Sequence, residues 1–243
     1  MRVRALRRAR DVSVGRAAHL VVPSEALRRL ALGWGIPEQR ITLVPNPVSA
    51  PLELPSREQL RRKHGLDGPT LVFAGRLAPQ KALDVALDAL AQTPNVRLLI
   101  AGDGPEESRL REHAAKLGLG DRARFLGAQP RSLVFELLRG ADAALLTSNW
   151  ENFPHMVVEA LAVGTPVLAT AVGGVSEIVR DGENGLLVLA GDVDGVASAI
   201  DRYFEDAGLR ERLRAAASSS VEVYAADRIY ERLGQILERA ARG

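Results

Sequence analysis

Between Leu145 and Val188 the chain reads LLTSNWENFPHMVVEALAVGTPVLATAVGGVSEIVRDGENGLLV. Apolar runs at 142–147, 166–170 and 186–188 have the composition of buried strands, and a helical pattern lies between the first two. Buried strands that alternate with helices indicate a parallel sheet that is covered on both faces. The stretch therefore predicts consecutive strand-helix units.

The same alternation extends through most of the chain. Further β-rich runs occupy 19–22, 41–44, 70–74, 96–101 and 123–126, and amphipathic helical patterns occupy 83–91, 106–117 and 132–139. Right-handed crossovers between such strands produce a doubly wound, Rossmann-like layer. Only helical patterns follow residue 192, and the last of them, at 221–241, carries an apolar stripe. The predicted fold class is α/β, a doubly wound parallel sheet with a C-terminal helical extension.

Composition narrows the classes of function. The 243 residues carry a formal net charge of +2, which gives no argument for a nucleic-acid partner. No cysteine is present, so disulfides and thiolate zinc sites are excluded, as is common for proteins of a reducing cytoplasm. The sequence contains no apolar run of transmembrane length and no signal-peptide pattern, and we expect a cytoplasmic protein.

The N-terminal segment is locally basic. Six arginines lie in the first sixteen residues, namely Arg2, Arg4, Arg7, Arg8, Arg10 and Arg16. Two interpretations remain open: peripheral contact with an anionic membrane surface, or the solvated face of an arginine-rich helix.

The loop after the run at 70–74 carries two cations. Gly75 and Arg76 follow the strand directly, and Lys81 precedes a helix that begins near Ala82. Ligands of open α/β sheets bind outside the carboxyl ends of the strands, and a helix N-terminus favours anions. Arg76 and Lys81 are therefore candidate phosphate-binding residues, while two ordinary surface cations are the alternative.

The next two loops contain glycine turns. Gly102 and Gly104 resemble the opening of a dinucleotide fingerprint, but position 107, where the third glycine would fall, is a glutamate. We interpret the turn as one that lets the backbone pass closely under a ligand. The loop after the run at 123–126, which includes Gln129 and Arg131, could border a nucleotide base.

Two glutamates, Glu151 and Glu159, stand eight positions apart, the first in a loop after a strand and the second on a helix. A pair at this spacing is close to chance by itself. Its position beside Pro154, which suits a first helical turn, favours a site that binds the hydroxyl groups of a ligand. A solvent-facing helix residue is the alternative for Glu159. His155 is a lone histidine, and we do not expect it to be catalytic.

Taken together, these residues resemble the C-terminal nucleotide-sugar domain of the retaining family-four glycosyltransferases, which have the GT-B fold. The matching features are Gly75-Arg76…Lys81, Gly102-Asp-Gly-Pro, Phe125-Leu-Gly127, Glu151-x7-Glu159, Gly164-Thr-Pro-Val, Gly173-Gly174 and Asn184-Gly-Leu-Leu-Val. The resemblance implies two facing Rossmann-like domains with a nucleotide-diphosphate sugar in the cleft. It also implies metal-independent transfer with retention of configuration and no cofactor besides the donor.

The resemblance also implies roles for individual residues. Arg76 and Lys81 would hold the donor diphosphate and stabilise it as the leaving group. Glu151 would contact the donor sugar, and Glu159 the ribose hydroxyls.

Further donor contacts would come from the remaining loop residues, which are Gly75, Gly102, Gly104, Gln129, Arg131, Asn152 and Phe153. The backbone amides of Asn152 and Phe153 would meet the sugar or the distal phosphate. At two positions, Asn152 and Ala82, the family usually has glycine, which puts the local backbone geometry in question.

Four prolines in the eleven residues from Pro45 to Pro55 indicate an extended connector. The stretch 16–44 before it resembles the last strand-helix-strand of the family's N-terminal domain. We therefore expect a remnant of that domain and a linker at 1–50, the nucleotide-sugar-binding domain at 51–220, and a helix at 221–243 that docks on the N-terminal domain.

Three functions remain open at this point. The chain is either the donor-binding half of a retaining hexosyltransferase, a binding module that needs a missing N-terminal domain or a second chain and has no turnover alone, or a GT-B-type nucleotide-sugar epimerase. The base, the sugar and the acceptor are not fixed by the sequence.

Overall fold

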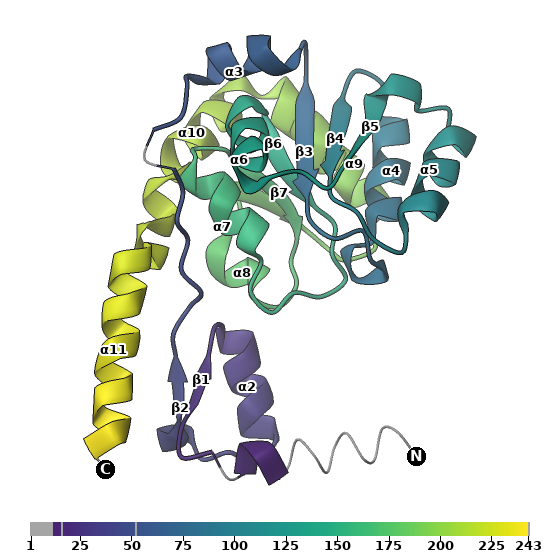
Figure 1. Ribbon diagram of the computed structural model, residues 1–243. Helices are drawn as coiled ribbons and strands as arrows, with labels where there is room; N and C mark the ends of the chain where they lie inside the picture. Colours follow the sequence, from purple (N-terminus) through teal and green to yellow (C-terminus); the bar gives the residue numbers. More distant parts are fainter. Residues whose placement is uncertain (1–11, 16, 52, 243) are drawn as a thin grey trace, which may run out of the picture.

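The computed structural model describes residues 12–15, 17–51 and 53–242, and the six N-terminal arginines lie outside these ranges. Its largest feature is a parallel sheet with the strand order β5-β4-β3-β6-β7-β8 (Figure 1). The strands, in chain order, are β3 (Thr70–Ala74), β4 (Arg97–Ala101), β5 (Ala123–Gly127), β6 (Ala143–Leu146), β7 (Val167–Thr170) and β8 (Gly185–Val188). The predicted α/β class and parallel sheet are confirmed.

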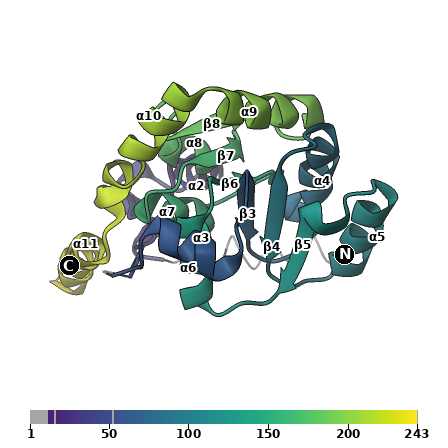
Figure 2. The same cartoon turned by 90° about the horizontal axis from the view of Figure 1, so that it is seen from above.

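Helices cover both faces of the sheet, as the continuous apolar strands require. On one face α4 (Leu83–Gln92) contacts α5 (Glu107–Lys116) and α9 (Val193–Glu205). On the other face α6 (Arg131–Gly140) contacts α3 (Arg57–His64) and α7 (His155–Ala162), and Figure 2 shows the two groups on opposite sides of the strands. The remaining α-helices of this part are the short α8 (Val175–Ile178) and α10 (Ala207–Ala217).

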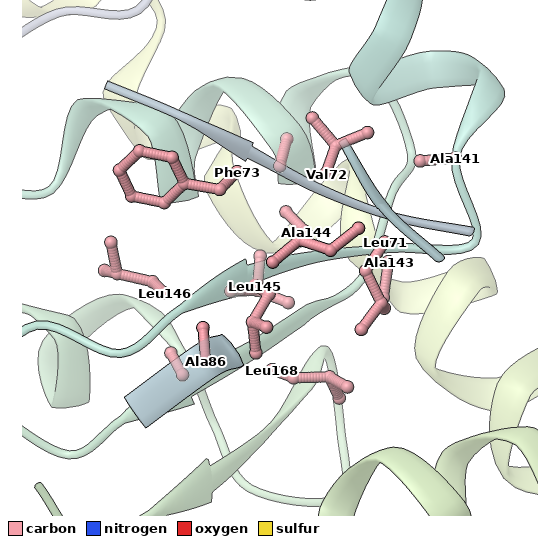
Figure 3. Packing of buried hydrophobic residues seen from close by; sticks show 14 of the residues in the cluster. Leu71, Val72, Phe73, Ala86, Ala141, Ala143, Ala144, Leu145, Leu146 and Leu168 are labelled. Carbon is pink, nitrogen blue, oxygen red and sulfur yellow. The ribbon is translucent and has the colours of Figure 1, made fainter. Parts of the chain in front are cut away.

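The centre of the core lies between β3 and β6 (Figure 3). Leu71 and Val72 of β3 pair with Ala143 and Ala144 of β6, and all four side chains are fully buried. Large residues on one strand face small residues on the other, which lets the two strands pack closely in this central layer. The strand order reverses at this pair, so the loops after β3 and β6 diverge to opposite faces and leave a crevice at their carboxyl ends.

Local sequence signals place the helix ends. Helix α3 begins with a capping box in which Ser56 and Gln59 bond each other's backbone N–H groups, and it ends at Gly65 in the left-handed conformation. Asp192 and Asp206 cap the N-termini of α9 and α10 through their side chains.

A smaller unit precedes the sheet. Strands β1 (Leu20–Val22) and β2 (Ile41–Leu43) pair in parallel, with α2 (Glu25–Gly33) and a 3-10 turn, η1 (Glu38–Arg40), between them. Their contact buries a separate small core of Val22, Ala31, Ile36 and Ile41. This strand-helix-strand segment, which we call the N-terminal unit, agrees with the secondary structure predicted for 16–44.

The C-terminal helix differs from the prediction at its start. A 3-10 segment, η4 (Ser219–Tyr224), precedes α11 (Ala226–Arg242), so the single helix predicted at 221–241 is interrupted. The interruption has a tertiary cause, because the backbone N–H of Val48 in the proline-rich connector donates to the Tyr224 carbonyl at 2.8 Å. Helix α11 extends beyond the six-stranded sheet on the side where the N-terminal unit lies (Figure 1). Within the described ranges, no helix combines the length and the apolar character needed to span a membrane.

Candidate functional site

A cavity of about 650 Å³ opens at the carboxyl ends of the central strands. It lies where β3 and β6 diverge, which is the position at which doubly wound sheets bind ligands. Nine of the eleven residues predicted for the site line it: Gly75, Arg76, Lys81, Gly102, Gln129, Arg131, Glu151, Phe153 and Glu159. Gly104 and Asn152 are not among the lining residues, whereas Asp103 and His155, which the prediction did not include, are.

The loop between β3 and α4 brings both cations to the cavity. The side chain of Arg76 is exposed, and it makes no hydrogen bond or ion pair with any residue that the structure describes. Lys81 ends a 3-10 turn, η2 (Pro79–Lys81), and its Nζ atom lies 2.5 Å from Oε1 of Glu151. A guanidinium with free donors beside a paired ammonium makes this end of the cavity electropositive.

Glu151 is buried, with 7% of its surface exposed. Its Oε1 atom accepts hydrogen bonds from Lys81 and, at 2.7 Å, from the hydroxyl of Ser148. Its Oε2 atom accepts none from the described part of the chain. One oxygen is thus held by the protein, and the other is free to accept a hydroxyl proton from a ligand.

Ser148 is a residue that the sequence analysis missed. It is fully buried just after β6, and its carbonyl accepts the hydroxyl of Thr170 from β7 at 2.6 Å. The signal that could have found it is a polar side chain at the end of a buried strand, three positions before a candidate glutamate.

Glu159 lies on α7 with 15% of its side chain exposed. Nε and Nη2 of Arg131 donate to its Oε1 atom at 3.2 and 2.9 Å. Glu159 therefore faces the cavity rather than open solvent, and Arg131 orients the carboxylate. Gln129, from the same loop as Arg131, turns back and donates to the Leu126 carbonyl at 2.5 Å.

The start of α7 supplies backbone donors. Pro154 precedes the helix without a side-chain cap, and the N–H groups of His155 and Met156 bond no acceptor in the described ranges. Such free N–H groups at a helix start attract anionic or hydroxyl oxygens. The ring of Phe153 packs edge-on against His155, with 5.5 Å between ring centroids. His155 also contacts Asn46 of the connector, with 3.2 Å between Nε2 and Nδ2.

The glycines after β4 have a structural reason that the sequence analysis did not identify. A Cβ atom on Gly102 would lie 1.8 Å from the Gly75 carbonyl oxygen, and one on Gly104 would lie 2.3 Å from that of Leu77. Leu77 N–H also donates to the Asp103 carbonyl at 2.6 Å. The loops after β3 and β4 are therefore in direct contact, and it is protein backbone that excludes a side chain at both glycines.

The second glycine pair, Gly173 and Gly174, supports the glutamate loop in the same way. A Cβ atom on Gly173 would lie 1.9 Å from the carbonyl oxygen of Glu151, and one on Gly174 would lie 2.4 Å from that of Asn152. This close contact fixes the backbone from which the Glu151 side chain extends.

The two positions where glycine is replaced differ from each other. Ala82 adopts the left-handed conformation with φ of 44°, the one positive φ among the non-glycine residues described. Asn152 does not, so the doubt about its backbone geometry is removed. An alanine in place of glycine at position 82 therefore carries local backbone strain, whereas an asparagine at position 152 does not.

Comparison with known proteins gives the family context of this cavity. A family model described as glycosyl transferases group 1 matches residues 56–220. The lipopolysaccharide core biosynthesis glycosyltransferase LpsE of Rhizobium meliloti is 37% identical over 147 residues, covering 60% of this chain and 43% of LpsE. The D-inositol 3-phosphate glycosyltransferase of Acidothermus cellulolyticus is 38% identical over 203 residues, covering 76% and 45%. The chain spans less than half the length of both relatives.

A solved structure has the same arrangement of elements. The crystal structure of Anabaena Alr3699/HepE in complex with UDP and glucose matches with a TM-score of 0.88 at 26% identity. The match covers 96% of this chain and 66% of that one. It therefore includes the N-terminal unit as well as the six-stranded sheet.

Proposed function

The chain belongs to the glycosyl transferases group 1 family, and from this premise we propose that it supplies the donor-binding half of a retaining glycosyltransferase. The observation that carries the proposal is the convergence of two cations and two carboxylates on one cavity at the strand reversal. Cations match a diphosphate, and carboxylates with free oxygens match the hydroxyls of a sugar and a ribose.

At the cationic end, Arg76 and Lys81 hold the donor diphosphate and neutralise the charge that develops on it as the sugar leaves. This supports a transfer that is independent of a metal. Lys81 is paired with Glu151, and the donor phosphate shares this ammonium with the carboxylate. Gly75, Gly102 and the free N–H groups at the start of α7 add backbone contacts.

At the carboxylate end, Glu151 accepts a sugar hydroxyl through its free Oε2 atom, and Glu159 accepts the ribose hydroxyls. Gln129 and Arg131 border the base. Gly104 and Asn152 are not among the residues that line the cavity, and we assign them a role in shaping the loops through their close backbone contacts.

The structural relative with UDP and glucose makes UDP the first nucleotide to test. Isothermal titration calorimetry of the purified chain against UDP, GDP and ADP should show heat for one of them. Arg76→Ala should weaken that nucleotide by about tenfold or more, because a charge-assisted bond to phosphate is lost.

Arg97→Ala is the matched control for this experiment. Arg97 is an exposed arginine at the opposite end of the sheet, at the start of β4, and its removal should leave the affinity unchanged. Absence of binding by all three nucleotides, or equal losses in the two variants, would reject the donor site.

A second candidate is a binding module without turnover of its own. The residues that line the cavity all come from loops and helices of the six-stranded sheet, so this part of the molecule carries by itself the groups needed to bind a nucleotide. If the chain is such a module, it should bind the nucleotide without hydrolysing the nucleotide sugar. Release of free sugar by the purified chain, abolished by Arg76→Ala, would exclude this candidate.

A further inference from the structure

Glu177 on α8 contacts the N-terminal unit across a long separation in sequence. Its Oε2 atom accepts the backbone N–H of Glu25 at 2.8 Å, and its Oε1 atom accepts that of Ala26 at 2.9 Å. These residues are 152 and 151 positions away in the chain. Both oxygens of one carboxylate are thus bonded to the first turn of α2.

Helix α2 needs these acceptors. The first N–H groups of a helix have no partner inside it, and they carry the positive end of the helix dipole. Ser24 caps the N–H of Leu27 at 3.2 Å, which leaves those of Glu25 and Ala26 to another acceptor. A carboxylate is the best acceptor at this end, because its charge complements the dipole.

Glu177 itself is exposed, and the backbone beside it is closely packed. Ser24 is 1% exposed, and a Cβ atom on Gly174 would lie 3.4 Å from the Ser24 Cβ atom. Gly174 also lies against the carbonyl of Asn152, next to Glu151. The segment from Gly173 to Glu177 therefore touches the N-terminal unit on one side and the loop of the donor cavity on the other.

The connector makes two further contacts with the same region. Asn46 meets His155 of the cavity wall at 3.2 Å, and Val48 N–H donates to the Tyr224 carbonyl at 2.8 Å. Both restrain the chain that leads from the N-terminal unit to the six-stranded sheet. The contacts at the start of α2 itself are those of Glu177 and of Gly174 against Ser24.

We propose that Glu177 is a positioning residue that sets the spacing between the N-terminal unit and the sugar end of the donor cavity. It accepts the first two N–H groups of α2 and thereby holds that helix beside the loop that carries Glu151. An effect of this spacing on sugar transfer rests on the proposed function. The spacing matters for transfer only if the N-terminal side of the molecule faces the donor across a cleft. The contact itself can be tested independently of any nucleotide.

The absence of cysteine from the sequence permits a direct measurement of the spacing. Spin labels attached through Leu30→Cys on α2 and Glu112→Cys on α5 report the distance between the two parts of the molecule, because both positions are exposed. Pulsed electron resonance on the full chain should give one narrow distance distribution. Glu177→Gln should broaden or shift it, because an amide offers one acceptor oxygen and turns its NH₂ group toward the other N–H.

Glu183→Gln is the matched control. Glu183 is an exposed glutamate six positions further on, and among the described residues its side chain pairs only with Arg180 of its own segment. Its replacement should leave the distribution unchanged. An unchanged distribution in Glu177→Gln as well would overturn the proposal.

Hydrogen exchange supplies a second readout and a check of folding. In Glu177→Gln the amides of Glu25 and Ala26 should exchange roughly fivefold to tenfold faster, the factor expected for loss of a helix-capping acceptor. Amides of β3 should keep their rates, which shows that the sheet remains folded. Unchanged rates at Glu25 and Ala26 would also refute the role of Glu177.

Calorimetry with UDP separates this proposal from the proposed function. Glu177→Gln should bind UDP as the unaltered chain does, because Glu177 does not line the cavity. If UDP, GDP and ADP bind neither protein, the donor site fails while the distance and exchange results still decide the role of Glu177. A large loss of nucleotide affinity in Glu177→Gln alone would contradict a role restricted to spacing.

Discussion

Among single residues, Ala82 shows how a loop can depart from glycine and still keep its shape. It links η2 to α4 in the left-handed conformation, and the hydroxyl of Thr147 donates to its carbonyl at 3.0 Å. An L-residue other than glycine pays about 1–2 kcal/mol for this conformation. The contacts of the neighbouring Lys81 with Glu151 and of Ala82 with Thr147 hold the strained turn in place.

Replacing alanine by glycine normally lowers the unfolding free energy. At Ala82 we expect this loss to be about 1 kcal/mol smaller than at a regular helix position, because glycine avoids the strain. Ala114 on α5 provides that comparison, because it lies inside a helix and is as buried as Ala82. Urea denaturation of both variants measures the difference. Equal losses of unfolding free energy at the two positions would show that Ala82 is not strained.

At the scale of elements, the site depends on how three loops lie against each other. Gly102 N–H donates to the Gly127 carbonyl at 2.7 Å, and Gly75 N–H donates to the Ala101 carbonyl at 2.9 Å. These hydrogen bonds extend the pairing of β3 with β4, and of β4 with β5, into the loops that follow the strands. The loops are consequently bonded to one another next to Arg76, which fixes the backbone from which its side chain extends.

Gly102→Ala should disrupt this arrangement, because its Cβ atom would lie 1.8 Å from the Gly75 carbonyl oxygen. We expect a loss of about 3 kcal/mol in unfolding free energy, the upper end for an overpacked site. Gly127→Ala is the control: it has φ of 70° but no atom within 4 Å of the added carbon, and about 1 kcal/mol of backbone strain is expected. Chemical denaturation checks both, and similar losses would argue against the steric explanation.

Across the whole molecule, a polar network joins helices at the amino ends of the central strands, the end of the sheet opposite the cavity. The carboxylate of Asp142 pairs with Arg57 and Arg61 of α3. Its carbonyl accepts the hydroxyl of Tyr203 at 2.6 Å and Nη2 of Arg214 at 2.8 Å. One turn before β6 thus connects α3, α9 and α10, which lie far apart in sequence.

The network makes stability sensitive to alkaline pH. Burial raises the pKa of the Tyr203 phenol above its usual value, because the charged form is disfavoured in the core. In the unfolded chain the phenol has a pKa of about 10, which is lower than in the folded protein. Below about pH 10 the phenol therefore makes its full contribution to stability. This contribution is lost as the pH rises towards the folded-state pKa.

Tyr203→Phe should cost about 1 kcal/mol at pH 7 through the lost hydrogen bond, and the cost should shrink above pH 10, where only the unaltered chain has a phenol to ionise. Denaturation at pH 7 and pH 10.5 measures both values. Tyr230→Phe, which changes an exposed tyrosine on α11, is the control and should show no such change with pH. A constant cost at the two pH values would contradict the role of the buried phenol.

The strands, most helices and the region of the site could be predicted from the sequence. Apolar periodicity is a local property, so all eight β-rich runs became strands, and the segments that follow β3, β4, β5 and β6 hold nine of the predicted residues at one cavity. Which atoms meet there depends on the tertiary structure. The Lys81, Ser148 and Glu151 cluster, the contact of Glu177 with α2, and the break before α11 each join segments that no local pattern relates. The physical reason is that such pairings depend on the packing of helices across the finished sheet, whereas the strands and helices depend on their own residues.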